Sequence, residues 1–351
     1  MINLNDLTFD ELEQAVVSSG EAKFRALQIF KWFAAGVTDF DEMTNISKAT
    51  KSKLSENYSI ASVKIYKKFC SAIDETVKYL LKLGDGSIVE SVAMKYKHGI
   101  SLCLSTQCGC NMGCRFCAST IGGKDRDLTA GEILGQAAVL QADLGERISN
   151  IVLMGIGEPL DNYDNVIRFL KNVNDERGMN IGYRHISLST CGLVDKINML
   201  AIEKMPITLS VSLHAPDDET RNKIMPVNKK YNVKKLIESC RDYIEVTGRR
   251  ISFEYILIDG VNDTTEHAIK LASLLKGMLS HVNLIPANFV PESGLKNSTK
   301  VNVQRFLNTL ESKGVNATVR RTLGSDIEAS CGQLRRNEMN RGQKNENLRN
   351  D

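Results

Sequence analysis

The chain has 351 residues, 42% of them hydrophobic and 25% charged, and this composition excludes collagenous, fibrous and intrinsically disordered proteins. The net charge of +3 is too small to identify a polyanionic partner. The acidic start lacks the pattern of a signal peptide, and no apolar run is long enough to cross a membrane. We therefore expect a cytoplasmic globular protein with no membrane partner.

The first part of the chain predicts a small helical module, residues 1–60. The sequence TFDE at 8–11 is a capping box ahead of an apolar stretch, which is typical of a helix start. A second helix is expected because Phe24, Leu27, Phe30 and Phe33 recur at helical spacing until Gly36. A third helix is expected at 47–56.

Residues 61–99 change character and predict a short antiparallel β extension. Three stretches, SVKIYKKFC, TVKYLLKL and SIVESVAMKY, are alternating or β-branched, and the sequence GDG at 84–86 is typical of a turn. Basic residues cluster here around Tyr66 and Tyr96, and again at 319–321 and 334–336. Such clusters fit RNA phosphates and base stacking, but solvated protein faces have the same composition, so charge alone leaves both interpretations open.

From residue 100 onward the chain repeats a strand followed by a helix. Six apolar strands are expected in SLCLST, NIVLMGIG, HISLST, ITLSVSLHA, ISFEYILIDG and HVNLIPANF, and a helical pattern follows each of them. Six such units predict parallel strands buried on both faces, in an open or partial barrel over residues 100–336. Functional side chains should then lie at the carboxyl ends of the strands. The polar tail, residues 337–351, is expected to be disordered.

Five of the nine cysteines lie between positions 103 and 117. In a reducing cytosol such a cluster predicts metal ligands or catalytic groups. Cys110, Cys114 and Cys117 have the spacing C-x3-C-x2-C, which lets one tight loop direct three thiolates at one inorganic centre. Three protein ligands suggest a 4Fe-4S cluster whose fourth iron is open to another ligand. The alternative is a zinc site completed by Cys108 or a histidine, although this spacing is not a zinc pattern.

The cysteine loop resembles the signature of radical S-adenosylmethionine enzymes, in which an aromatic residue, here Phe116, precedes the last cysteine. Gly157 and Glu158 resemble the motif that holds the methionine amino group in that superfamily. The resemblance implies that the open iron binds S-adenosylmethionine. An electron from an external one-electron donor would then release a 5′-deoxyadenosyl radical.

Motifs along the whole chain, including the N-terminal module, resemble the RlmN/Cfr family of RNA adenine methyltransferases. They are GCNMGCRFC, MGIGEPLDN, ISLSTCG, SLHAPDDETRNKIMPVN, YILIDGVND, LIPANF and GSDIEASCGQL. The resemblance implies an α/β fold, a partial (β/α)6 barrel, and a monomer that uses a 4Fe-4S cluster and two S-adenosylmethionine molecules. Pro159 favours C2 methylation of adenine in 23S rRNA and tRNA, with RNA contacted by residues 1–60. The alternative is a C8 methyltransferase of 23S rRNA that confers antibiotic resistance.

The family resemblance also implies roles for three residues outside the metal loop. Cys331 would carry the methyl group as S-methylcysteine. Cys103 would help to release the product, ending in a transient disulfide with Cys331, and Glu90 would be the base. Whether Glu90 or Cys103 takes the ring proton stays open. Without the resemblance, Cys103 would be a core residue and Glu90 an exposed strand carboxylate.

Contacts with S-adenosylmethionine are expected at the ends of the strands. The matching positions are Gly157, Glu158, Ser189, Ser212, Leu213, His214 and Asn288. A satisfied structural role is the ordinary alternative for His214. Cys108 departs from the family pattern, and we keep Cys110 as the ligand because a shift to Cys108 would change the spacing. The remaining cysteines, Cys70, Cys191 and Cys240, are expected to be structural, buried or on a helix face.

Overall fold

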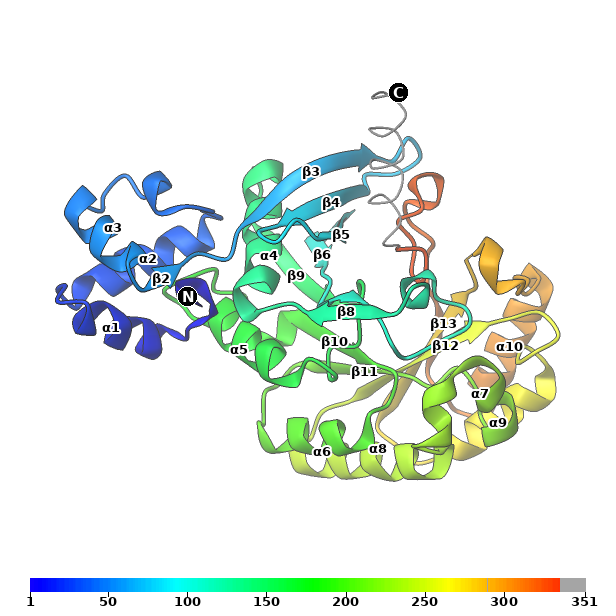
Figure 1. Cartoon of the computed structure of the whole chain (residues 1–351). Coiled ribbons are helices and arrows are strands. Elements are labelled where there is room, and N and C mark those ends of the chain that lie inside the picture. Colours follow the sequence, from blue (N-terminus) through cyan, green and yellow to red (C-terminus); the bar gives the residue numbers. More distant parts are fainter. Residues whose placement is uncertain (289, 335–351) are drawn as a thin grey trace.

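A ten-stranded sheet forms the centre of the computed structural model, which describes residues 1–288 and 290–334 (Figure 1). Seven of its strands are parallel neighbours. In spatial order they are β6 (Gly99–Cys103), β9 (Ile148–Leu153), β10 (Ile186–Thr190), β11 (Thr208–Ser212), β12 (Ile251–Leu257), β13 (Ser280–Pro286) and β14 (Ala317–Val319). The tail predicted to be disordered, 337–351, lies outside the described residues.

Helices cover the outer face of the curved sheet, as Figure 1 shows. They are α4 (Ala130–Leu144), α5 (Tyr163–Asn174), α6 (Val194–Ile202), α8 (Val233–Thr247), α9 (Thr265–Leu275) and α10 (Lys300–Ser312). The six predicted strand and helix units are therefore confirmed. The short helix α7 (Asp218–Ile224) and strand β14 were not predicted, because neither has a sustained apolar pattern. Strand residues such as Leu188, Val211 and Phe253 are fully buried, as expected between two layers.

The antiparallel strands predicted before residue 100 are part of the same sheet. They are β3 (Val63–Cys70), β4 (Val77–Leu83) and β5 (Ile88–Tyr96), and the two hairpins β3–β4 and β4–β5 form as expected. Strand β5 pairs antiparallel with β6, so the extension continues the barrel rather than forming a sheet of its own. This pairing places β5 beside the first parallel strand, at one edge of the barrel.

The N-terminal module contains α1 (Phe9–Ser18), α2 (Phe24–Ala34) and α3 (Lys48–Ser55), and its two ends meet where β1 (Ile2–Asn3) pairs with β2 (Tyr58–Ser59). The predicted capping box forms, since the Thr8 amide donates to the Glu11 carboxylate at 2.9 Å. Phe30 and Phe33 are buried, but Phe24 at the start of α2 is 59% exposed, so the apolar stripe is shorter than predicted.

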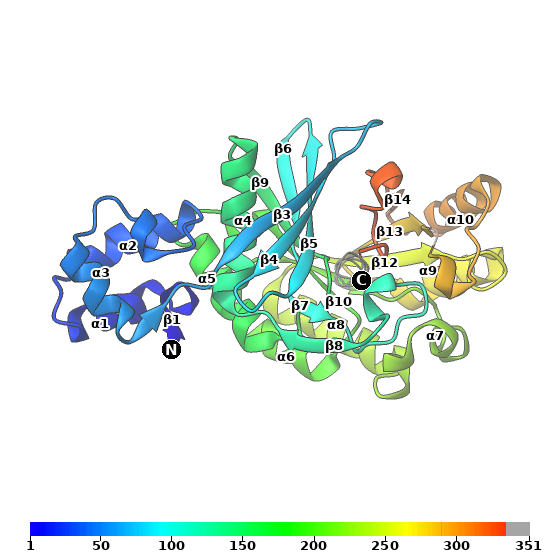
Figure 2. The same cartoon turned by 45° about the horizontal axis from the view of Figure 1, so that its top comes forward.

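The module lies against α4 and α5, at the side of the barrel (Figures 1 and 2). Gly36 permits the approach to α4: its φ is +85°, and a Cβ there would lie 3.1 Å from backbone atoms of Ala138. On the same side, the Gly131 amide at the start of α4 donates to Asp6 at 2.7 Å. The module is therefore tied directly to the helix that follows the cysteine loop.

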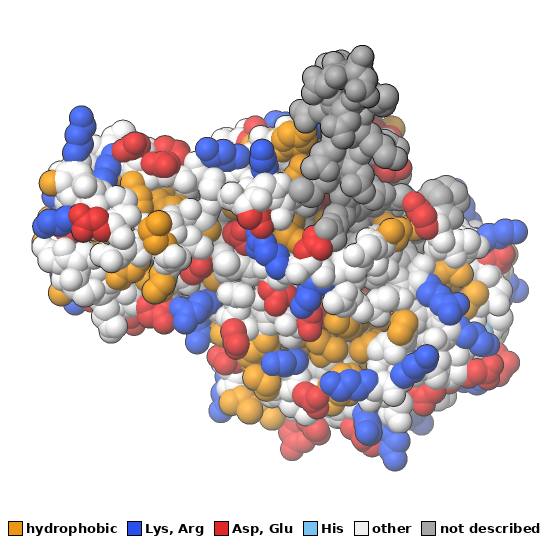
Figure 3. All heavy atoms as spheres, in the orientation of Figure 1, with side chains coloured by type: hydrophobic (Ala, Val, Ile, Leu, Met, Phe, Trp, Pro, Cys, Tyr) orange, Lys and Arg blue, Asp and Glu red, His pale blue; other side chains and the backbone are white. Residues whose placement is uncertain are grey.

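The surface does not by itself identify a partner. Figure 3 shows basic and acidic side chains interspersed over the described part of one face, without a large area of one sign. Within residues 1–288 and 290–334, no helix is both long and apolar enough to cross a bilayer. Function must therefore be argued from the chemistry of the site.

Candidate active site

Two neighbouring cavities open at the carboxyl ends of the parallel strands. The larger has an empty volume of about 900 Å³ and is lined by the three loop thiols and the ends of β9 to β13. The smaller, about 550 Å³, is lined by Cys103 and by residues of β5 and β13. Four residues line both cavities: Met154, Ile285, Arg320 and Cys331.

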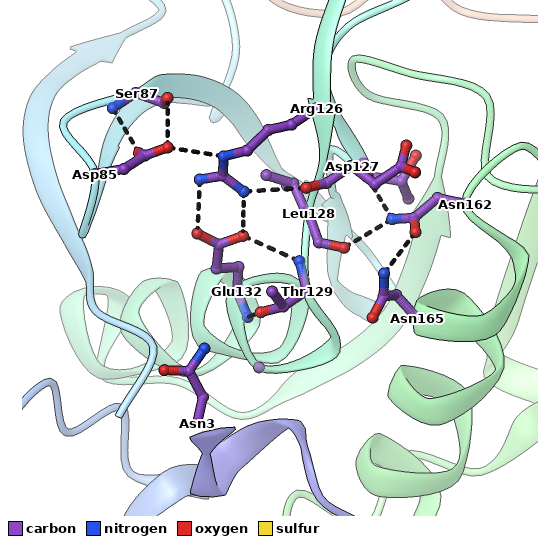
Figure 4. A network of polar contacts seen from close by, with 12 residues as sticks. Asn3, Asp85, Ser87, Arg126, Asp127, Leu128, Thr129, Glu132, Asn162 and Asn165 are labelled. Atoms are coloured by element: carbon purple, nitrogen blue, oxygen red, sulfur yellow. Dashed lines mark hydrogen bonds and ion pairs between the residues drawn. The ribbon is translucent and has the colours of Figure 1, made fainter. Parts of the chain in front are cut away.

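The cysteine loop is anchored at its base by the hairpin of β7 (Gln107–Gly109) and β8 (Lys124–Asp127). Arg126 on β8 donates to both oxygens of Glu132, at 2.7 and 2.9 Å, and to Asp85 at 2.7 Å (Figure 4). The Asn162 amide donates to the Leu128 carbonyl at 2.7 Å. These contacts fix the loop to the first turn of α4 and to the β4–β5 turn.

We expect Arg126→Met to lower the free energy of unfolding by about 2–3 kcal/mol, because Glu132 is buried and would lose its charged partner. Arg126→Lys should lower the free energy of unfolding by less, because the lysine ammonium group can still donate a hydrogen bond to Glu132. Urea unfolding of both variants measures the difference. Equal stability of Arg126→Met and the wild type would contradict this role for the network.

The three loop thiols surround a common space. Cys110 and Cys114 are buried and Cys117 is half-buried. Burial raises the pKa of the Cys110 thiol to about 12 and that of Cys114 well above its usual value. These thiols would therefore be neutral without a metal, and a bound iron centre would supply the positive charge that favours their thiolate forms.

Three thiols that line one cavity are the donor set of a 4Fe-4S cluster with one iron open to another ligand. Among the described residues, no three His, Cys, Asp or Glu side chains converge closely enough to hold one metal ion. Cys108, the possible fourth zinc ligand, does not line the cavity and lies on β7 near Arg126. The residues present fit a 4Fe-4S cluster held by Cys110, Cys114 and Cys117, and a zinc site completed by Cys108 gains no support.

Most of the residues expected to bind S-adenosylmethionine line the larger cavity. They are Gly157, Glu158, Ser189, Ser212 and His214. Leu213 does not line it, because its side chain is fully buried in the core. Asn288 lines the smaller cavity instead, where its amide donates to the Cys331 carbonyl at 2.9 Å.

Glu158 is held rigidly at the wall of the larger cavity. Its two oxygens accept hydrogen bonds from the backbone amides of Cys191, at 2.7 Å, and Leu160, at 3.0 Å. Burial raises the pKa of this carboxyl group. A cationic ligand group placed beside it would stabilise the carboxylate form. The preceding Gly157 has φ +111°, and a Cβ there would lie 2.7 Å from Gln107, so only glycine fits this turn.

His214 lies at the end of β11 with a left-handed backbone, φ +58°. Its Nδ1 accepts a hydrogen bond from the Ile256 amide at 3.0 Å, and its ring meets the Phe116 ring edge-on at 4.8 Å. Because an amide only donates, the neutral imidazole must carry its proton on Nε2. Burial lowers the pKa of His214 to about 3, so the ring is neutral at physiological pH. The side chain thus offers the cavity a hydrogen-bond donor.

This burial predicts a pH dependence of stability. Between about pH 6.5 and 3 the unfolded chain binds a proton at His214 that the folded chain does not, so acidification favours unfolding. We expect the stability of the wild type, relative to His214→Asn, to fall by up to about 1.4 kcal/mol per pH unit below pH 6.5. Asparagine keeps an acceptor and tolerates the left-handed backbone. Urea unfolding at pH 7, 6 and 5 provides the test, and parallel curves for the two proteins would refute it.

Arg221 from α7 fixes the two loops that carry these residues. Its side chain is fully buried and donates to the carbonyls of Cys191 at 2.7 Å and Leu213 at 3.0 Å. It donates also to the Ser212 carbonyl, at 3.1 Å. One guanidinium group therefore joins the ends of β10 and β11 at the wall of the larger cavity. The sequence offered no signal for this role, because an arginine in a short helix is ordinarily a surface residue.

Three further residues line the larger cavity and were not predicted to be functional. Cys191, expected to be structural, lies there beside Glu158. Glu254 on β12 is buried and accepts from the Asn283 amide at 2.8 Å. A carboxylate inside the apolar strand ISFEYIL was the available signal. Arg320 follows the unpredicted strand β14, and electrostatic interaction with Cys331, and then with Glu254, raises its pKa.

Cys331 and Cys103 are brought together at the smaller cavity. Cys331 is half-buried, Cys103 is buried, and all nine cysteines, which lie in the described residues, are free thiols. Burial, followed by the neighbouring charge of Cys331, raises the pKa of Cys103 to about 12. Cys103 therefore rests as a protonated thiol.

Glu90 is buried on β5, contrary to the exposed position that an isolated strand carboxylate would have. It shares a strand face with Val92 and Met94, which line the smaller cavity, but it is not itself among the lining residues. Of the cysteines expected to be structural, Cys240 is buried on α8, whereas Cys70 is exposed at the end of β3. The prediction for Cys70 was wrong because the last position of an edge strand is open to solvent.

Comparisons with known proteins agree with this geometry. Residues 104–272 match the Radical SAM superfamily, and residues 2–60 match the Ribosomal RNA large subunit methyltransferase N-terminal domain. Two relatives, one from Alkaliphilus oremlandii and one from Clostridium perfringens, are named "probable dual-specificity RNA methyltransferase RlmN". Each is 57% identical to this chain. These matches cover 95% and 96% of this chain, and 98% and 97% of the relatives. A crystal structure of a radical SAM methyltransferase from Sphaerobacter thermophilus is 41% identical, with a TM-score of 0.91, and the match covers 96% of this chain and 100% of that one.

Proposed function

Because this chain belongs to the RlmN family of radical S-adenosylmethionine enzymes, we propose that it methylates C2 of adenine in both 23S rRNA and tRNA. As a member of the family it is an RNA methyltransferase that uses a 4Fe-4S cluster and S-adenosylmethionine. The proposed targets are an adenosine of the peptidyl-transferase centre and the adenosine beside the anticodon of certain tRNAs. The observation that carries the proposal is the position of Cys331, which lines the cavity of the cluster thiols and the cavity of Cys103.

The larger cavity would hold the cluster and the nucleoside. Cys110, Cys114 and Cys117 would bind the irons, and Glu158 would accept hydrogen bonds from the methionine amino group. When bound, the cluster and S-adenosylmethionine supply the methyl group and the radical that later removes a hydrogen atom from it. His214 would donate from Nε2 to the nucleoside, and Phe116 shields one side of that ring.

Cys331 would act as the methyl carrier. An adenine ring carbon that bears hydrogen is electron-poor, so it does not displace a methyl group from a sulfonium, whereas a cysteine sulfur does. Cys331 therefore takes the methyl group first and loses the thiol proton. After a hydrogen atom is removed from that methyl group, its carbon bonds to C2 of the adenine, and protein and RNA are joined. The joined species carries one unpaired electron, which would have to pass to the oxidised form of the one-electron donor before the link is broken. Arg320, a charged side chain shared by both cavities, lies near this sulfur throughout.

Cys103 would release the product. Its thiol would first give up its proton to a base, and its sulfur then bonds to that of Cys331 as the bond between Cys331 and the methylene carbon breaks. The electron pair of the broken bond leaves with the carbon, which takes a proton to become the new methyl group. A cellular thiol reductant would then return two electrons and two protons to the disulfide.

The ring proton needs an acceptor before the link breaks. Since burial keeps Cys103 protonated, it cannot be that acceptor without losing its own proton first. This favours Glu90 as the base, on the β5 face that carries Val92 and Met94. From its present position, Glu90 would have to reach the ring by rotation of its side chain or through one water molecule.

RNA would approach the open side of the two cavities. We assign its contacts to the N-terminal module and to β3, where Lys64, Tyr66, Lys67 and Lys68 are exposed. The proposal includes a monomer that acts in the cytoplasm and receives single electrons from an external donor.

The test is to map methyladenosine in 23S rRNA and tRNA from cells with and without the gene. We expect C2-methyladenosine in both RNAs to disappear without the gene and to reappear on complementation. Loss of C8 methylation instead would identify the Cfr-type alternative, which the names of the relatives do not favour. If the methyladenosine content of 23S rRNA and of tRNA is the same with and without the gene, the proposed function is overturned.

A further inference from the structure

The backbone on both sides of Cys331 has almost no regular structure. Residues 323–334, here called the carrier segment, contain one short 3-10 turn and no strand. Three of its side chains, Leu323, Ala329 and Leu334, join a small apolar cluster with Cys103. So few apolar contacts would not by themselves fix a segment that holds a reactive sulfur between two cavities.

The tip of the β3–β4 hairpin forms hydrogen bonds with one end of the carrier segment, and the two lie side by side in Figures 1 and 2. The Asp326 carboxylate accepts hydrogen bonds from the Ser71 hydroxyl and the Ala72 amide, both at 2.7 Å. In the opposite direction, Asp74 accepts from the Gly324 amide at 2.9 Å. These five residues are called the clasp below. Its bonds join positions about 250 residues apart in the chain.

The fit at the clasp is close. A Cβ on Gly324 would lie 2.8 Å from both Thr76 and Ala329, and the glycine has φ +60°. Asp74 is itself held in place, because its other oxygen accepts from the Thr76 amide at 2.9 Å. The hairpin tip therefore packs closely against Gly324 and holds the Asp74 carboxylate in position to accept its amide hydrogen bond.

The other end of the carrier segment is tied to the cluster loop. The Ala118 amide, directly after Cys117, donates to the Gly332 carbonyl at 2.8 Å. The Ser119 hydroxyl donates to the Leu334 carbonyl at 3.0 Å. Cys331 thus lies between two anchors, one on the β extension and one beside a cluster ligand.

We propose that Asp74 and Asp326 are positioning residues that hold the carrier segment so that the Cys331 sulfur can serve both cavities. The inference rests on the proposed role of Cys331 as methyl carrier. With its backbone fixed at both ends, Cys331 can change cavity by rotation about its Cα–Cβ bond. Small displacements of a reacting atom cost large factors in rate, so loosening one anchor should be visible in the chemistry of this sulfur.

The first test measures thiol pairing in the full-length protein without RNA. Mild oxidation with diamide, followed by peptide mapping, gives the rate at which Cys103 and Cys331 form a disulfide. We expect Asp326→Leu to slow this pairing about tenfold. Asp326→Asn keeps an acceptor oxygen and should stay closer to the wild type. Asp242→Leu, at an exposed position on α8, is the matched control and should not change the rate.

The second test measures coupling in the reconstituted enzyme with S-adenosylmethionine and RNA. In Asp326→Leu we expect several times more 5′-deoxyadenosine per methyl group placed on RNA, because hydrogen removal continues while transfer fails. The unfolding midpoints of the variants should stay near that of the wild type, which separates positioning from general stability.

The outcomes distinguish the two proposals. If the wild type does not methylate RNA, the proposed function fails, and the pairing rates still decide whether the clasp positions Cys331. If the wild type methylates RNA and Asp326→Leu pairs its thiols and couples its reaction as the wild type does, the clasp proposal alone is overturned. Faster pairing in Asp326→Leu would overturn it as well.

Discussion

We expect Cys331→Ala to abolish RNA methylation, with a loss of more than about a thousandfold, while the iron content stays that of the wild type. The reason is that Cys331 is not among the three thiols proposed to bind the cluster, although it lines the same cavity. Without its sulfur the proposed methyl carrier is missing, and the adenine carbon cannot take the group directly. Quantitative methyladenosine analysis of RNA incubated with the reconstituted variant provides the measurement.

Cys114→Ala is the matched control for this prediction, because it removes a sulfur from the same cavity but from the set proposed to bind iron. It should lose iron and activity together. If Cys331→Ala still methylates RNA, the carrier role is wrong, whatever its iron content. If Cys331→Ala loses its iron, the division between ligands and carrier is wrong.

Cys103→Ala is expected to stop the reaction later, with protein and RNA covalently joined. Cys103 lies at the smaller cavity with Cys331, and the link through Cys331 cannot be broken when the attacking sulfur is missing. Turnover should fall by about a hundredfold or more, and a protein–RNA species should accumulate. Denaturing gel electrophoresis with labelled RNA detects this species, and nuclease digestion followed by mass spectrometry locates it on Cys331.

The double variant Cys103→Ala with Cys331→Ala should form no such species, which ties the adduct to Cys331. Cys240→Ala is a suitable control, since this thiol is buried on α8 away from both cavities. Normal turnover by Cys103→Ala would remove its proposed task. An adduct that persists in the double variant would show that another residue forms the link.

The fold could be predicted from the sequence where apolar periodicity was long. The six strand and helix units and the capping box at Thr8 follow from local pattern alone. Strand β14 could not be predicted, because it has three residues and its place depends on pairing with β13. The antiparallel pairing of β5 with β6 also could not be predicted, because cross-strand partners are set by tertiary contacts rather than by the residues of one strand.

The residues of the candidate site likewise fall into those that a local sequence pattern predicted and those that only the tertiary structure brings to the site. The spacing of the loop thiols and the family resemblance of Glu158 predicted residues that the structure places at one cavity. Arg320 was missed because no local pattern distinguishes an arginine beside a cavity from one in solvent. Cys191 was assigned a structural role for a similar reason: only the packing of β10 beside β9 places it next to Glu158.

The shared wall of the two cavities has a thermodynamic consequence. Because Met154, Ile285, Arg320 and Cys331 belong to both, a ligand that shifts this wall in one cavity changes the shape of the other. Linkage then requires reciprocity: whatever factor a nucleoside in the larger cavity applies to the affinity for RNA, RNA applies to the affinity for that nucleoside. Any coupling between the occupancies of the two cavities through this wall is therefore a property of the binding equilibria, separate from the chemical steps.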